Sequence, residues 1–172
     1  MNGERSGQAE RAVAGRRALT ALATLAALAT LSACSLVNRG DDGDAVSVFD
    51  VHVGQCFLAP QDITVELSTL AAVDCTEPHE QEAYALAAFT APGTDTTPDD
   101  FPGEAALKEF AEGTCAERFA DYVGVDYRDS ELYFTYLVPS PRGWEQDGDR
   151  TTLCFVTTTG AQLTQSVAGT GW

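Results

Sequence analysis

The sequence predicts a small α+β domain, with a largely antiparallel β-sheet, one main amphipathic helix packed on it and two disulfides. Segments rich in β-branched and aromatic residues lie on both sides of a single helical segment, which is the element order of an α+β domain. The chain has no alternating strand-helix-strand units, and this argues against a dinucleotide-binding fold. Apart from Cys34, the chain has an even number of cysteines, as expected for a disulfide framework.

Residues 1–33 have the pattern of a bacterial lipoprotein signal peptide. Arg11, Arg16 and Arg17 supply basic charge, and residues 18–33 are uncharged and rich in Ala and Leu, like the apolar region of a signal peptide. This uncharged run of 16 residues is shorter than the roughly 20 that a membrane-spanning helix needs. Leu-Ser-Ala-Cys at residues 31–34 resembles a lipobox, which implies lipid on Cys34 and cleavage before it. Ordinary secretion and a retained anchor are the alternatives.

The predicted mature chain is strongly acidic and has the size of one domain. Removing 33 of the 172 residues leaves 139, with 6 basic and 24 acidic residues and a net charge of about −18. Such a surface repels phosphate backbones and anionic headgroups, so we expect no nucleic-acid partner and a membrane anchor made by lipid alone.

Residues 34–45 read as a flexible acidic tether, and residues 46–172 as the extracytoplasmic domain. The tether contains Asp41, Asp42 and Asp44. These aspartates do not begin a calcium loop of the EF-hand type, because position 12 counted from Asp41 is His52 and such a loop needs a bidentate Glu there.

The first half of the domain contains several predicted strands. Residues 46–58 predict a strand that turns near Gly54 into a short second one, and residues 63–67 alternate as in a half-buried strand. Residues 70–75 are apolar and end at Thr76-Glu77-Pro78. Residues 82–90 predict a strand, although their four alanines also permit a helix. Residues 91–102 contain three prolines and predict a long surface loop.

A helix is predicted over residues 103–122, with Asp99 or Asp100 at its N-cap and Gly124 at its C-cap. Its apolar positions recur at spacings of three and four, and they are Leu107, Phe110, Ala111, Thr114, Cys115, Phe119 and Tyr122. Residues 131–139 predict a buried strand and residues 140–149 a loop. Two further strands are expected at 150–159 and 161–168, with the turn at Gly160.

Four cysteines are available for disulfides: Cys56, Cys75, Cys115 and Cys154. Three pairings are open, and sequence order favours Cys56 with Cys75 and Cys115 with Cys154, because the first pair brackets a predicted hairpin. Free buried thiols are the alternative. The chain contains no C-x-x-C, the local arrangement that a redox-active or zinc-binding pair would use.

The order of several short motifs resembles the septum-formation domain of actinobacterial membrane proteins and lipoproteins. The resemblance covers roughly residues 46–169 and is carried by Val-Gly-Gln-Cys-Phe (53–57), Val-Asp-Cys-Thr-Glu-Pro-His (73–79), Glu-Ala-Tyr-Ala (82–85), Cys115, Pro139-Ser140, Trp144, Gly-Asp-Arg (148–150) and Cys154. Gln165-Ser166 departs from the Gly-Ser expected near the end of the family. The resemblance implies a disulfide-bonded extracytoplasmic domain linked to cell division, without established catalytic activity.

Catalytic patterns are weak in this sequence. His79 is followed by Glu80 and Glu82, but the second histidine of H-E-x-x-H is missing, and only His52 remains to supply a third zinc ligand. No G-x-S-x-G is present, so a serine nucleophile has no recognisable turn to present it. We therefore expect no catalytic residues, no metal and no cofactor.

Five residues are candidates for a binding surface, and each also has a structural interpretation. They are His79, Glu82, Trp144, Asp149 and Arg150. Trp and Arg dominate binding hot spots, and loops often carry function. In the structural interpretation, His79 fixes the turn after Cys75 through a carbonyl or Glu82, Trp144 covers an edge of the core, and Arg150 pairs internally.

The sequence thus favours a non-enzymatic lipoprotein on the outer face of the cytoplasmic membrane. Its domain would bind or scaffold an envelope protein or a cell-wall component, with a link to septum formation. The alternative is an envelope hydrolase or metal-dependent enzyme that uses His79 and Glu82.

Overall fold

A computed structural model describes residues 43–60 and 67–172 of the chain. These residues form a six-stranded sheet with the strand order β1-β3-β2-β4-β6-β5, in which every strand pair is antiparallel. The elements are β1 (Asp44–Ser47), the 3₁₀ turn η1 (Val48–Asp50), β2 (Cys56–Phe57), β3 (Thr69–Val73), β4 (Gln81–Ala88), α1 (Glu104–Val123), β5 (Tyr133–Leu137), the π-helical turn η2 (Gly143–Asp147) and β6 (Thr151–Thr157). The predicted α+β class is confirmed.

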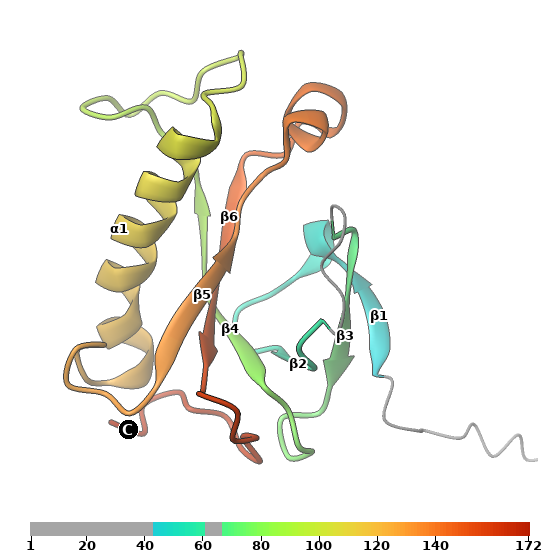
Figure 1. Ribbon diagram of the computed structural model, residues 1–172, viewed down its shortest axis with the longest axis vertical. Coiled ribbons are helices and arrows are strands. Elements are labelled where there is room, and N and C mark those ends of the chain that lie inside the picture. Colours follow the sequence, from blue (N-terminus) through green and yellow to red (C-terminus); the bar gives the residue numbers. More distant parts are fainter. Residues whose placement is uncertain (1–42, 61–66) are drawn as a thin grey trace, which may run out of the picture. The chain divides into compact units, whose positions relative to one another are not determined.

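The helix covers one part of the sheet only. Figure 1 shows α1 alongside β4, β5 and β6, whereas β1 and β3 lie away from it. One apolar cluster fills the space under α1 and includes Phe119, Cys115 and Val156. A second cluster, with Phe57, Leu70 and Phe155, lies on the other face of the central strands. The middle strands β4 and β6 therefore have apolar side chains on both faces, as a buried strand requires.

The helix begins and ends at glycines. Its N-cap is Gly103 rather than Asp99 or Asp100, so the predicted N-cap was wrong; the Asp99 carbonyl is instead bonded by Trp144 and Arg150. Gly124 forms the predicted C-cap, with φ of 94° and its N–H donating to the Ala120 carbonyl, a left-handed position that suits glycine.

Both predicted disulfides are present, Cys56–Cys75 and Cys115–Cys154. The second joins the buried face of α1 to β6. The first joins β2 to the turn after β3, next to the strand that carries Glu82.

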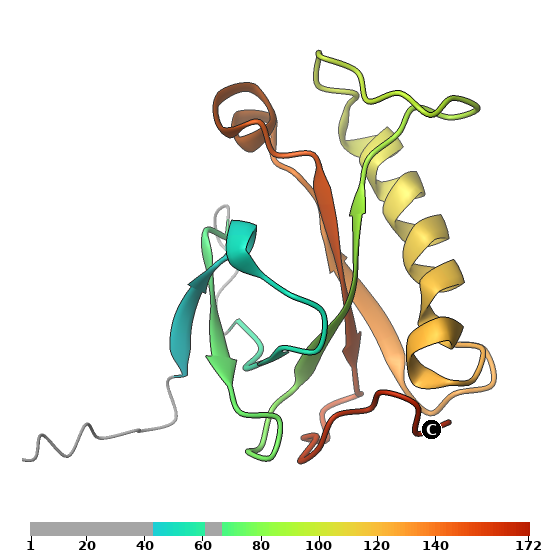
Figure 2. The same ribbon diagram turned by 180° about the vertical axis from the view of Figure 1, so that it is seen from behind.

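Several predicted strands differ in the structure. Residues 161–168 form no strand beyond an isolated bridge between Leu163 and His79, because this segment crosses the end of the sheet towards α1, as Figure 2 shows. Within this segment the Val167 N–H donates to the Glu82 carboxylate, and just after it Gly169 N–H donates to the Tyr122 carbonyl and Gly171 N–H to that of Val123. The strand expected to be buried at 131–139 is the edge strand β5, and its Tyr133 is 53% exposed.

Other expectations are refined or lie outside the described residues. The strand predicted over 46–58 is interrupted by η1. The predicted loop 140–149 contains the turn η2. The signal peptide, Cys34, Asp41, Asp42 and most of the strand predicted at 63–67 fall outside the described residues. Within the described ranges, no helix has the length and hydropathy that crossing a membrane would require.

Candidate functional site

Glu82 is a fully buried carboxylate in the middle of the domain. Its Oε1 accepts hydrogen bonds from the Tyr122 hydroxyl at 2.5 Å and the Ser166 hydroxyl at 2.6 Å. Its Oε2 accepts one from the Val167 backbone N–H at 2.8 Å. A buried charge requires such partners. These three bonds tie β4 to the last turn of α1 and to the C-terminal segment, so Glu82 organises the fold.

His79 is also fully buried, at the turn between β3 and β4. Its Nδ1 lies 2.8 Å from the Glu77 carbonyl oxygen, which can only accept, so Nδ1 carries the proton. Its backbone pairs with Leu163 through two hydrogen bonds of 2.9 and 2.7 Å. The ring therefore fixes the turn after Cys75, as its structural interpretation states, and its Nε2 has no hydrogen-bond partner among the described residues.

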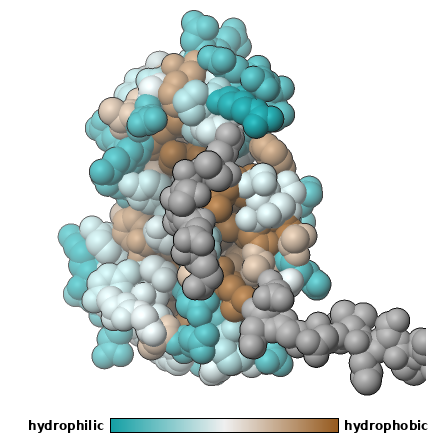
Figure 3. All heavy atoms as spheres, turned by 45° about the vertical axis from the view of Figure 1, so that its right-hand side comes forward, coloured by the Kyte–Doolittle hydropathy of each residue, from teal (hydrophilic) through white to brown (hydrophobic). Residues whose placement is uncertain are grey.

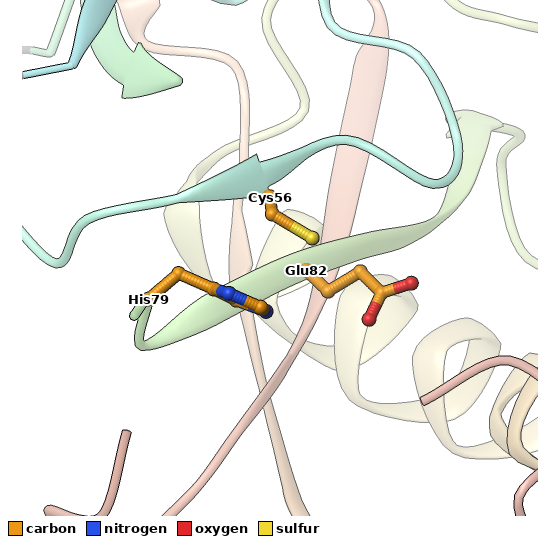
Figure 4. Close-up of side chains that lie close together, drawn as sticks. All are labelled: Cys56, His79 and Glu82. Carbon is orange, nitrogen blue, oxygen red and sulfur yellow. The ribbon is translucent and has the colours of Figure 1, made fainter. Parts of the chain in front are cut away.

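Cys56, His79 and Glu82 form a cluster whose ligand atoms all lie within 4.8 Å of one another. Figure 4 shows the three side chains close together on β2, the turn and β4, with the Glu82 carboxylate directed away from the His79 ring. As ligands they do not fit a zinc ion in this state, because the Cys56 sulfur is bonded to Cys75 and a zinc ligand is a thiolate. The carboxylate of Glu82 already accepts three hydrogen bonds. Too few free ligand atoms therefore remain in the cluster to supply the three protein ligands of a catalytic zinc.

Trp144, Asp149 and Arg150 lie together at another end of the sheet. The indole of Trp144 is 1% exposed, and the Arg150 guanidinium lies 3.8 Å from its ring centroid. Arg150 donates to the carbonyls of Trp144 and Asp149 at 2.7 and 2.9 Å. Trp144 Nε1 donates to the Asp99 carbonyl at 2.8 Å. These contacts close the loops around a third apolar cluster, formed by Phe89, Leu107 and Trp144, and they match the structural interpretation of Trp144 and Arg150.

Asp149 supports the same turn. Its Oδ1 accepts a hydrogen bond from the Thr151 N–H at 2.9 Å, and partial burial raises the pKa of its carboxyl above the usual value. The structure thus brings His79 to Glu82, and Trp144 to Asp149 and Arg150, as two separate groups.

An open depression lies between α1 and the middle of β4. Its volume is about 210 Å³, and it is lined by Val53, Tyr84, Ala85, Leu86, Arg118, Asp121 and Tyr122. Val53 and Leu86 are large apolar residues with 52% and 40% of their surface exposed. Figure 3 shows a further feature of the surface, hydrophobic residues gathered in the middle of the face that carries β1 and β3.

Arg118 is the basic residue of this depression, and its guanidinium has no polar partner among the described residues. Within residues 43–60 and 67–172 it makes no hydrogen bond and no ion pair, whereas Lys108, Arg128, Arg142 and Arg150 each have a polar partner. Sequence reasoning missed Arg118, since an arginine on the polar side of an amphipathic helix is ordinary. Only the packing of α1 beside β4 places it next to Val53 and Leu86.

Comparison with known proteins agrees with the motif order described above. No curated protein and no solved structure matches the chain. The family described as septum formation matches residues 53–171, which include both disulfides, the Glu82 cluster and the depression beside Arg118. The chain belongs to the septum-formation family.

Proposed function

We propose that this chain is a non-enzymatic lipoprotein that binds or scaffolds a partner of the division machinery on the outer face of the cytoplasmic membrane. Membership of the septum-formation family supports the link to cell division. The signal-peptide pattern and Cys34 support the lipid anchor. The partner is an envelope protein, and a cell-wall component is the alternative.

The observation that carries this proposal is the placement of the residues best suited to chemistry. His79 and Glu82 have no exposed surface, and Glu82 accepts three internal hydrogen bonds. A general acid or base must reach the proton that it transfers. By contrast, the depression beside Arg118 is open to solvent. The burial of His79 and Glu82 and the open depression beside Arg118 together support a binding role.

The second candidate is an envelope hydrolase or metal-dependent enzyme that uses His79 and Glu82, and their proximity favours it. Substituting His79→Ala tests both candidates in one protein, with fold followed by circular dichroism. The binding proposal predicts unchanged partner capture in molecules that remain folded. Retained capture together with loss of a measurable turnover would overturn it in favour of the enzyme.

The lipid anchor is tested by labelling cells with a radioactive or clickable fatty acid. The wild-type chain and a Ser35→Ala control should incorporate label and sediment with membranes. Cys34→Ser should do neither. A Cys34→Ser chain that still carries label and stays on the membrane would contradict the anchor.

The division link is tested by localisation and depletion. A fluorescent fusion at the C-terminus should be enriched at division sites, and depletion of the protein should delay septation and lengthen cells. A uniform envelope distribution together with normal septation would contradict the proposal.

A further inference from the structure

One edge of β4 is only partly paired. The two-residue strand β2 pairs with Gln81 and Glu82, and the preceding turn extends this pairing to Ala83, through Gly54 N–H to the Ala83 carbonyl at 2.7 Å and Ala83 N–H to the Gln55 carbonyl at 2.9 Å. Beyond Ala83, none of the strands described in the structure pairs with this side of β4. Half of the central strand is therefore an open edge.

The backbone groups of Leu86 and Ala88 face this open edge. The register of β4 against β6 shifts at Tyr84, and the Phe89 N–H then donates to the Arg150 carbonyl next to β6 at 2.7 Å. Because strand residues alternate in direction, Leu86 and Ala88 direct their N–H and C=O groups to the opposite side. Both residues are exposed. An edge of this kind is a template for a further strand.

The depression beside Arg118 adjoins the same edge, since Leu86, Ala85 and Tyr84 line it. A strand placed there would meet apolar surface from Val53 and Leu86. It would also meet the guanidinium of Arg118, which has no partner among the described residues. Arginine and a carboxylate form a strong, directional pair. The site thus offers backbone pairing, an apolar contact and one anion-binding group.

Charge indicates what kind of strand fits. The predicted mature chain carries 24 acidic and 6 basic residues, and Asp121 lies in the depression with Arg118. A partner that is basic overall is attracted to this surface, while an acidic one is repelled. A second copy of the chain would bring two strongly negative surfaces together. Charge complementarity therefore favours a segment that is basic overall and that places one carboxylate against Arg118.

We propose that the open edge of β4 binds an extended, net-basic peptide segment of a partner protein as an added β-strand, with one carboxylate of the segment on Arg118. The proposal rests on the proposed function as a binding module and names its recognition site. Main-chain pairing with Leu86 and Ala88 supplies affinity, and side-chain contacts with Arg118, Leu86 and Val53 supply specificity.

The test selects peptides from a random displayed library against the purified full chain in detergent. Enriched peptides should be net basic and should contain a carboxylate. In fluorescence anisotropy, Arg118→Gln should weaken their binding about tenfold or more, the size expected for a lost charge-assisted pair. Lys108→Gln, which removes an exposed charge from the same helix away from the depression, should leave binding unchanged. Methylating alternate peptide nitrogens should abolish binding, and the peptide should slow hydrogen exchange over residues 85–89.

Three results would overturn the proposal: a selection that enriches no peptide, binding unaffected by both Arg118→Gln and nitrogen methylation, or self-association of the chain that masks residues 85–89. Thermal unfolding of Arg118→Gln like that of the wild type ensures that a loss of binding is local. If peptides fail while the chain still localises to division sites and captures a division protein, this inference falls and the proposed function stands. If both fail, the proposed function falls as well.

Discussion

Tyr122, in the last turn of α1, donates a 2.5 Å hydrogen bond to the buried carboxylate of Glu82 in β4. The two residues are 40 positions apart in the chain. Ser166 and Val167 complete the set of donors from the C-terminal segment. This contact joins three parts of the domain that share no local sequence pattern.

Substituting Tyr122→Phe should lower the free energy of unfolding by about 1–3 kcal/mol, because a buried carboxylate loses one of its donors. Urea unfolding followed by circular dichroism measures the change. Tyr136→Phe is the matched control, since its hydroxyl makes an exposed 3.3 Å bond to Glu112 and its removal should cost much less. Equal losses in the two variants would contradict the role assigned to Glu82.

Alkaline pH should reduce the stability advantage of the wild type over Tyr122→Phe, measured as the difference in their free energies of unfolding. Burial, and next the hydrogen bond to Glu82, raise the pKa of Tyr122 well above its usual value. The unfolded chain loses this proton near pH 10, and the folded chain holds it to higher pH. The stabilising effect of the hydroxyl is therefore complete below about pH 10 and is lost as pH rises above it. Urea midpoints of both proteins at about pH 8 and about pH 11 test this, and a constant difference would contradict it.

Trp144→Ala should lower the free energy of unfolding by about 3–5 kcal/mol, as for a large aromatic side chain removed from a core. Trp144 is 1% exposed, and it packs against Phe89 and Phe101. In Trp172→Phe, Trp144 is the remaining tryptophan, and its fluorescence should resist iodide until the protein unfolds. Trp144→Phe leaves Trp172, which is 45% exposed and should be quenched in the folded state. Easy quenching of Trp144 in the folded protein would contradict its burial.

The two disulfides should differ in reactivity. Cys115 and Cys154 are fully buried, whereas Cys75 is partly exposed. Dithiothreitol under native conditions should therefore open Cys56–Cys75 first, and Cys115–Cys154 only on unfolding. Alkylation and mass spectrometry give the order, and prior reduction of Cys115–Cys154 would contradict it.

Removing either disulfide should lower the free energy of unfolding, and the two losses should differ in size. Sequence separations of 19 and 39 residues correspond to about 3 and about 4 kcal/mol in the chain-entropy model. Denaturant unfolding of the double alanine variants measures both values. A larger loss for the Cys56 and Cys75 pair would show that loop length does not set their contribution.

Features with a local cause could be predicted from the sequence. The helix over 103–122, its end at Gly124 and the strands at 82–90 and 150–159 follow from periodicity and glycine chemistry. Four cysteines in sequence order sufficed for the correct disulfide pairing. Residues 161–168 were predicted as a strand from their composition, yet they cross the end of the sheet, because their partners His79 and Glu82 lie far away in the chain.

The α+β class, the disulfide framework, the family resemblance and the acidic character of the domain could be inferred from the residues alone. Tertiary structure decided which polar residues are structural and which are accessible. Glu82 and Trp144 are buried, whereas Arg118 lies beside an open strand edge without a polar partner among the described residues. The physical reason is that burial and partner choice depend on residues that meet only after α1, β4 and the C-terminal segment pack together, and no local pattern records those neighbours.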